Sequence, residues 1–240
     1  MRHVVQREIG RVLSPLWTPV AVFLMRFVMR YRIADRDEVR ATFAGIRSES
    51  CAPLLICANH LTMIDSFLVA WALTPNWRYS VFYDELPWNV PERSNFASNP
   101  WERFTSYVMK CIPITRGGSR EEVASVLDRV ARLTRAGEVA LLFPEGGRSR
   151  TGRVDVEGAG WGIGRIVSAV PGCRVVCVYM RGRAQEAFGQ RPVRGETLDV
   201  AVECIEPKSD LRGIRRSRDF SQQIISRLAA MEREYFDGRK

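Results

Sequence analysis

Histidine is scarce in this chain: only His3 and His60 occur in 240 residues. Six cysteines are present, but no two of them form a Cys-x-x-Cys pair, and a structural zinc site needs four closely spaced cysteine or histidine ligands. The sequence therefore predicts no metal site. Most of the cysteines lie inside apolar runs, which indicates reduced, buried thiols and a protein that faces the cytosol.

Several other patterns are missing. No Gly-x-Ser-x-Gly sequence occurs, because Ser149 lies in Gly-Arg-Ser-Arg-Thr, and this argues against the nucleophile turn of α/β-hydrolases. A serine-type lipid esterase or hydrolase stays open as an alternative enzyme. Residues 2–14 are polar and charged with no small-residue cleavage site after the apolar part that follows, so a secretory signal is not predicted. Basic and aromatic residues do not interleave, which argues against a nucleic-acid partner.

The longest apolar run, residues 16–29, is interrupted by Pro19 and Arg26. It therefore falls short of the roughly 20 consecutive apolar residues that a spanning helix needs. Arginines flank the run, Trp17 and Phe27 suit the membrane interface, and the net charge of the chain is +9. We expect residues 1–32 to form an amphipathic helical segment on an anionic membrane surface. A soluble helix packed on the core is the alternative.

The remaining residues, 33–240, have the length and composition of one domain. Strands and helices are expected to alternate, which predicts an α/β fold: a single layered domain whose mixed, mostly parallel sheet is flanked by helices. The strands are expected at residues 31–34, 54–58, 78–83, 111–114, 139–143, 175–180 and 198–204. The helices are expected at residues 37–43, 66–73, 101–109, from 120 to a stop at Gly137, and 220–235. The glycines at residues 158–164 predict a helix packed tightly on the sheet rather than a dinucleotide loop.

The first candidate site follows the apolar strand at residues 54–58. His60 lies at the exit of this strand, and Asp65 opens the next helical pattern. A carboxylate bonded to one ring nitrogen of a histidine fixes the tautomer and leaves the other nitrogen free to take a proton. The spacing predicts such a pair at the rim of the sheet. A helix-capping loop with a structural histidine is the alternative.

The second candidate site follows the apolar strand at residues 139–143. The turn after it carries Glu145, paired glycines, Arg148 and Arg150. Glycines permit φ > 0 and let main-chain N–H groups approach a ligand closely, while guanidinium groups bind phosphate through charge-assisted hydrogen bonds. The turn therefore predicts a phosphate site, with a solvated charged turn as the alternative.

Together the two stretches resemble the glycerolipid acyltransferase superfamily, in particular the lysophosphatidic acid (1-acyl-glycerol-3-phosphate) acyltransferases. The first motif of that family, His-x-x-x-x-Asp, is matched by His60 and Asp65. Its third motif, Phe-Pro-Glu-Gly-Thr-Arg-Ser, is matched by residues 143–149, with Gly147 in place of threonine. The order and the separation of the two motifs also agree with the family.

The other two motifs are matched less completely. The second ends Phe-Ile-Asp-Arg after a glycine, whereas this chain has Lys110 at the glycine, Thr115 at the acid, and Arg116. The fourth, an apolar strand with a proline, corresponds to residues 175–179, which lack proline. The resemblance covers roughly residues 54–180.

The resemblance implies transfer of a fatty acyl group from a thioester donor, acyl-CoA or acyl-carrier protein, to the hydroxyl of a lysophospholipid, foremost lysophosphatidic acid. His60 would be the general base and Asp65 would orient it, with no metal, no other cofactor and no acyl-enzyme. The expected location is the cytoplasmic face of the cell membrane, peripheral or monotopic. A non-catalytic lipid-binding protein is a further alternative. The resemblance assigns acceptor binding to Glu145 and Gly146 and phosphate binding to Arg116 and Arg148, and the predicted substrate-binding set also includes Gly147 and Ser149.

Overall fold

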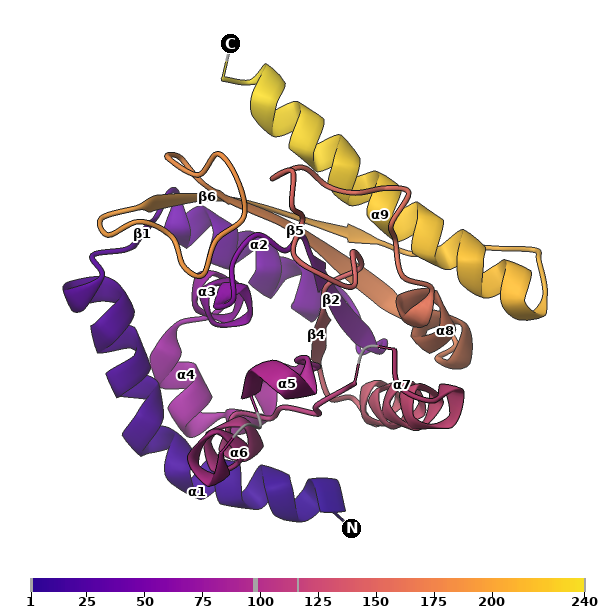
Figure 1. Ribbon diagram of the computed structural model, residues 1–240, viewed down its shortest axis with the longest axis horizontal. Helices are drawn as coiled ribbons and strands as arrows, with labels where there is room; N and C mark the ends of the chain where they lie inside the picture. Colours follow the sequence, from indigo (N-terminus) through magenta and orange to yellow (C-terminus); the bar gives the residue numbers. More distant parts are fainter. Residues whose placement is uncertain (1, 97–98, 116, 240) are drawn as a thin grey trace.

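The computed structural model describes residues 2–96, 99–115 and 117–239, and these form a six-stranded sheet in the order β1-β6-β5-β2-β4-β3 (Figure 1). Strands β5 and β6 are antiparallel and the other neighbouring pairs are parallel. The predicted α/β fold with a mixed, mostly parallel sheet is therefore confirmed. The strands are β1 (Arg32–Ile33), β2 (Leu54–Ala58), β3 (Trp88–Asn89), β4 (Ala140–Leu142), β5 (Arg174–Gly182) and β6 (Thr197–Ile205).

Helices cover both faces of the sheet, and this explains the continuous apolar runs of the central strands. Every residue of β2 is buried, and successive residues alternate between two core clusters: Leu55 and Cys57 belong to one, Ile56 and Ala58 to the other. One cluster is covered by α7 (Arg120–Arg135), α8 (Gly162–Ala169) and α9 (Gly213–Asp237), and the other by α2 (Arg36–Glu49) and α3 (Asp65–Leu73).

The glycines at residues 158–164 serve helix packing, but the close neighbour is a helix rather than the sheet. A Cβ atom at Gly164 would lie 1.8 Å from the carbonyl oxygen of Ser217, so only glycine lets α8 approach α9 this closely. The Gly164 N–H also donates to Ser221 Oγ at 3.0 Å. The helix also packs on the sheet, because Ile163, Ile166 and Val167 join the core cluster that holds Leu55 and Val175.

Two of the expected strands are wrong. Residues 78–83 fall instead in α4 (Asn76–Val81) and a 3₁₀ turn, η2 (Tyr83–Glu85). Tyr79 and Tyr83 lie four residues apart and are both buried, which is helical spacing, and their hydroxyls donate to Ala70 O and Val108 O. Residues 111–114 form only isolated bridges at Cys111 and Ile114, since Pro113 has no N–H to donate to a ladder. The stretch before them holds α5 (Arg93–Phe96) and α6 (Pro100–Val108), the latter close to the expected helix.

The N-terminal segment is one continuous helix, α1 (Arg2–Phe23), which passes through two prolines and continues as a π-helical turn, η1 (Leu24–Val28). Pro15 removes the N–H that would bind Arg11 O, and the hydroxyl of Ser14 donates to that oxygen at 2.9 Å. Helix α1 runs along α4 and α6 (Figure 1). Among the described residues, the helical stretch His3–Val28 alone has the length and hydropathy to cross a membrane. The boundary at residue 32 between an N-terminal segment and the rest stays a prediction.

Candidate active site

His60 lies just beyond the carboxyl end of β2, where Asn59 ties this strand to β5. The Asn59 side chain donates to Met180 O at 3.0 Å and accepts from Met180 N at 2.8 Å. The chain then turns, and His60 Nδ1 lies 3.0 Å from Asp65 Oδ2 at the first residue of α3. The carboxyl ends of parallel strands are the usual edge for ligand sites in open α/β sheets. The two members of the first predicted pair thus meet at that edge.

The Asp65 carboxylate is buried and receives donors on both oxygens. Besides His60, the backbone N–H groups of Leu61 and Thr62 donate to Oδ2 at 2.6 and 2.7 Å, and the Thr62 hydroxyl donates to Oδ1 at 2.5 Å. This network fixes the carboxylate in one position. With Nδ1–H donating to Asp65, the lone pair of the ring is on Nε2, which can accept a proton. The His60 side chain is 12% exposed, so the ring is largely enclosed but not sealed from a substrate.

The turn at residues 144–149 holds the His60 peptide at both ends. Glu145 Oε1 accepts the His60 N–H at 2.9 Å, and the Ser149 N–H donates to His60 O at 2.9 Å. The imidazole stacks on the Phe143 ring with centroids 4.1 Å apart. Burial raises the pKa of Glu145 to about 7, despite the N–H donors of His60 and Asp155. In this structure Glu145 therefore contacts the backbone of the first motif.

The remaining predicted residues of this turn have distinct surroundings. Gly146 has φ +64°, which favours glycine, and its N–H donates to Phe143 O at 3.0 Å. Ser149 is buried, and its Oγ accepts the Arg153 N–H at 3.0 Å and contacts Arg153 O. Its hydroxyl is therefore tied into the turn, where a nucleophile of the alternative esterase would need to be free.

Gly147 and Arg148 line a hollow of about 480 Å³ together with Arg150 and Phe188. The Arg148 guanidinium donates to Gly189 O at 3.0 Å and lies 5.6 Å from the centre of the Phe188 ring. One wall of the hollow is therefore fixed by a contact that does not involve a substrate. Two guanidinium groups facing one hollow suit a phosphate or another anion.

The loop between β5 and β6 contributes residues that sequence reasoning missed. Gly189 N donates to Leu61 O at 2.9 Å, and Gln190 O accepts from Met63 N at 3.1 Å. This loop therefore packs directly on the His60 turn and carries Phe188 into the arginine-lined hollow. It has no motif or periodicity that could have identified it from the sequence, because main-chain bonds to the His60 turn set its place.

The second motif is only partly visible, because Arg116 lies outside the described residues. Lys110 adopts φ +53°, a conformation that favours glycine, the residue that the family has there. Its ammonium group is fully buried, 3.0 Å from Glu138 Oε2, and burial lowers its pKa. Arg7 of α1 donates to the same carboxylate at 2.9 Å. Lys110 thus belongs to an ion cluster that joins α1 to the domain.

Metal ligands do not gather anywhere in the described part of the chain: no group of three histidine, cysteine, aspartate or glutamate side chains is placed to hold an ion. Every cysteine there is a free thiol.

Comparison with known proteins gives one family match. A family model described as "Acyltransferase" matches residues 31–181, more than half of the chain, from just before β1 to near the end of β5. The match includes both His60–Asp65 and the turn at residues 143–149. A search of curated proteins gave no match. The chain therefore belongs to the acyltransferase family, the glycerolipid acyltransferases that include the lysophosphatidic acid acyltransferases.

Proposed function

We propose that this acyltransferase moves a fatty acyl group from a thioester to the free hydroxyl of a lysophospholipid, with lysophosphatidic acid as the acceptor. The observation that carries the proposal is the His60–Asp65 pair, 3.0 Å apart, next to a hollow that presents Arg148 and Arg150. A base beside an anion site suits an acceptor that bears a hydroxyl and a phosphate.

In the proposed reaction, His60 Nε2 takes the proton of the acceptor hydroxyl while its oxygen attacks the thioester carbonyl. The tetrahedral intermediate then collapses, the C–S bond breaks, and the thiolate takes the proton back from His60. An alcohol is a weak nucleophile at neutral pH, and a positioned general base typically contributes about 10²–10⁴-fold. Asp65 stabilises the imidazolium formed in the first step.

The intermediate also needs donors for its oxyanion. The N–H groups of Gly146 and Ser149 are occupied by Phe143 O and His60 O. In the described part of the chain the N–H groups of Gly147 and Arg148 have no such acceptor, so we assign them this role. One such donor is worth about 10²–10³-fold in rate.

The acceptor phosphate would bind in the hollow between Arg148 and Arg150, with Arg116 as a further ligand by family resemblance. Phe188 also lines the hollow, and we assign it the limit on the size of the headgroup. Glu145 acts in this scheme through the His60 backbone.

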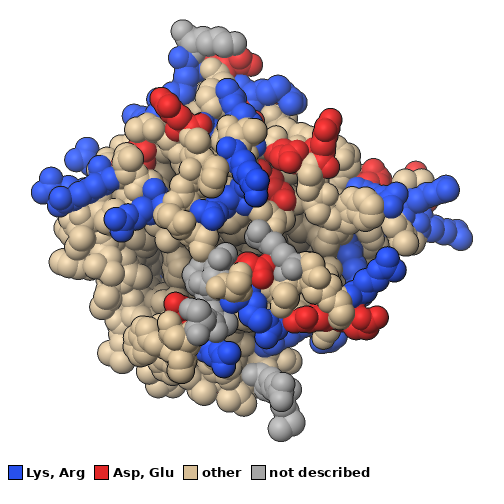
Figure 2. Space-filling model, in the orientation of Figure 1, with Lys and Arg blue, Asp and Glu red and all other residues tan. Residues whose placement is uncertain are grey.

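The membrane is the proposed source of the lysophospholipid acceptor. Helix α1 exposes apolar side chains such as Leu16, 70% exposed, and α4 adds Trp77, 60% exposed. An apolar groove of about 720 Å³ lies between these two helices. Figure 2 shows few charged side chains on the side of the molecule where α1 lies. This supports a peripheral or monotopic protein, and we propose the cytoplasmic leaflet as its site.

The direct test is a product screen by mass spectrometry. Purified protein in mixed micelles receives one acyl thioester and a panel of lysolipids with different headgroups. We expect diacyl product from lysophosphatidic acid, and His60→Ala should lower kcat by at least about 10²-fold with an unchanged circular dichroism spectrum. Free fatty acid instead of a diacyl lipid would indicate a hydrolase, and retained turnover in His60→Ala would remove the proposed base.

A further inference from the structure

The start of α9 carries an exposed cluster of arginines, here called the arginine ridge, that the proposed reaction does not use. It consists of Arg212, Arg215, Arg216 and Arg218, all exposed, and none of the four forms an ion pair within the described residues. Between residues 208 and 219 cations outnumber acids by five to two. Figure 2 shows Lys and Arg side chains projecting at the right of the view, where Figure 1 places the start of α9.

The ridge is unfavourable for the helix that carries it. The first turn of α9 has no acid, and its N-cap, Arg212, makes no capping hydrogen bond through its side chain. A helix N-terminus is the positive end of the helix dipole, and like charges three or four residues apart repel each other. Arginines placed against these rules point to a role in binding an anionic partner.

Apolar side chains lie among the cations. Ile214 is 70% exposed and Trp161, which stacks under the Arg218 guanidinium at 3.9 Å, is 55% exposed.

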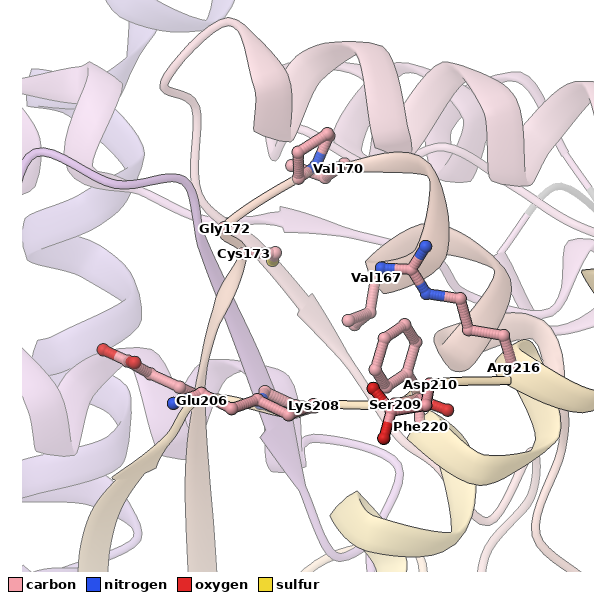
Figure 3. Close-up of a pocket in the computed structure, with 12 residues that line it drawn as sticks. Val167, Val170, Gly172, Cys173, Glu206, Lys208, Ser209, Asp210, Arg216 and Phe220 are labelled. Atoms are coloured by element: carbon pink, nitrogen blue, oxygen red, sulfur yellow. The ribbon is translucent and has the colours of Figure 1, made fainter. Parts of the chain in front are cut away.

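Two hollows flank the ridge. The one in Figure 3, about 440 Å³, is lined by the cations Lys208 and Arg216, the acids Glu206 and Asp210, and apolar residues that include Phe220. The other, about 470 Å³, is lined by Trp161, Leu211, the cations Arg215 and Arg218, the acids Glu157 and Asp219, and residues 156, 159, 221 and 222.

This second hollow shares a loop with the candidate active site. Val156, Glu157 and Ala159 of this loop line the hollow, and the residues just before and just after them, Asp155 and Gly160, contact the third motif. Asp155 N donates to Glu145 Oε2 at 3.4 Å, and Gly160 N donates to Pro144 O at 2.8 Å. A partner seated on the ridge would therefore lie next to the turn that holds His60.

A bilayer is not the occupant that the geometry favours. The half of α1 that continues into η1 lies at the left of Figure 1, whereas α9 begins at the right. One flat membrane that covers the exposed apolar side chains of that half would leave the ridge in water. The partner must then be a soluble molecule with negative charge and some apolar surface.

Resting on the proposed function, we propose that the arginine ridge docks an acidic acyl-carrier protein, which delivers the thioester donor past the loop at residues 155–160. Carboxylates of the carrier pair with the ridge, and Ile214 and Leu211 pack on its apolar side chains. The chemistry at His60 is unchanged, and the thiolate that leaves stays on the carrier. The ridge thus sets the preference for a carrier-borne donor over coenzyme A.

The test compares Arg212→Glu/Arg215→Glu with a charge-matched control, Arg132→Glu/Arg233→Glu, two exposed arginines outside the ridge. Glutamate at a helix start suits the dipole, so the ridge variant should fold, as a thermal melt will show. The same acyl chain is offered on an acidic acyl-carrier protein and on coenzyme A at low and high salt. Binding of the unacylated carrier is measured separately by fluorescence anisotropy.

We expect the ridge variant to raise the KM of the carrier-borne donor about 10–100-fold at low salt, with less than a twofold change for acyl-CoA and none in the control. An unchanged carrier KM, or an equal rise for both donors, would overturn the inference. The inference would also be overturned if the ridge variant lost binding to vesicles of anionic phospholipid but still bound the carrier, because the ridge would then be a membrane contact. If neither donor yields product but carrier binding falls in the ridge variant alone, the proposed function fails while the docking surface stands.

Discussion

Replacing Asp65 with asparagine separates the charge of the buried carboxylate from its geometry. An amide oxygen at the position of Oδ2 keeps the acceptor for His60 Nδ1 and the Leu61 and Thr62 N–H groups, and the amide NH₂ faces the Thr62 hydroxyl, which can turn to accept. The turn should therefore persist. What disappears is the negative charge that stabilises the imidazolium in the transition state.

The size of that loss follows from the separation of the two charges. With charge centres about 4 Å apart and an effective dielectric constant near 20, the attraction is about 4 kcal/mol. At 1.36 kcal/mol per factor of ten, Asp65→Asn should lower kcat by about 10³-fold, with little change in the KM of either substrate.

The assay is steady-state acyl transfer with lysophosphatidic acid and one saturating acyl thioester. Thr62→Val serves as the control, because it removes a neutral donor to the same carboxylate and keeps the charge. It should cost about 1 kcal/mol of stability and less than tenfold in kcat. An Asp65→Asn protein that folds normally and keeps kcat within threefold of the wild type would refute the assignment of Asp65 as the partner of the base.

Two further predictions concern the turn of the third motif. Arg148→Ala should raise the KM of a phosphorylated acceptor about 10–100-fold with a smaller change in kcat, because a charge-assisted hydrogen bond is lost, and an unchanged KM would reassign the side chain. Glu145→Gln should flatten the dependence of stability on pH. The raised pKa, about 7 in the folded protein against 4.5 for the free group, means that the wild type loses stability as pH rises from about 4.5 through 7, by roughly 3 kcal/mol at most. Thermal melts of both proteins between pH 4.5 and 8 measure this difference, and parallel curves would count against it.

The sequence was informative where structure depends on neighbouring residues. The run at residues 54–58, the turn after it and the helix that begins at Asp65 are all local, and His60 and Asp65 meet because the four residues between them form a turn. The same holds for α7, where Ser119 Oγ accepts from Glu122 N at 3.1 Å, and where Gly137 follows with φ +86°.

Sequence reasoning failed where long-range contacts decide the local structure. The aromatic run near Tyr79 alternates like a strand, but the segment is a helix because Tyr79 and Tyr83 bury one face against α3 and α6. The loop that carries Phe188 and Gly189 has no periodicity and owes its place to main-chain bonds with the His60 turn. No local pattern could have identified either.

The position of Glu145 shows why motif residues far apart in sequence form one unit. Strands β2 and β4 are parallel neighbours with Cys57 opposite Leu142, so the turns that follow them must emerge side by side at the same edge. The main chain of the first turn then needs hydrogen-bond partners, and the second turn supplies an acceptor for the His60 N–H and a donor for its carbonyl. The family resemblance assigns Glu145 to binding of the acceptor substrate, but in this structure its carboxylate also holds the backbone of His60, the proposed base. Because the base and the arginine-lined hollow share these bonds, a change at Glu145 should disturb proton transfer and acceptor binding together.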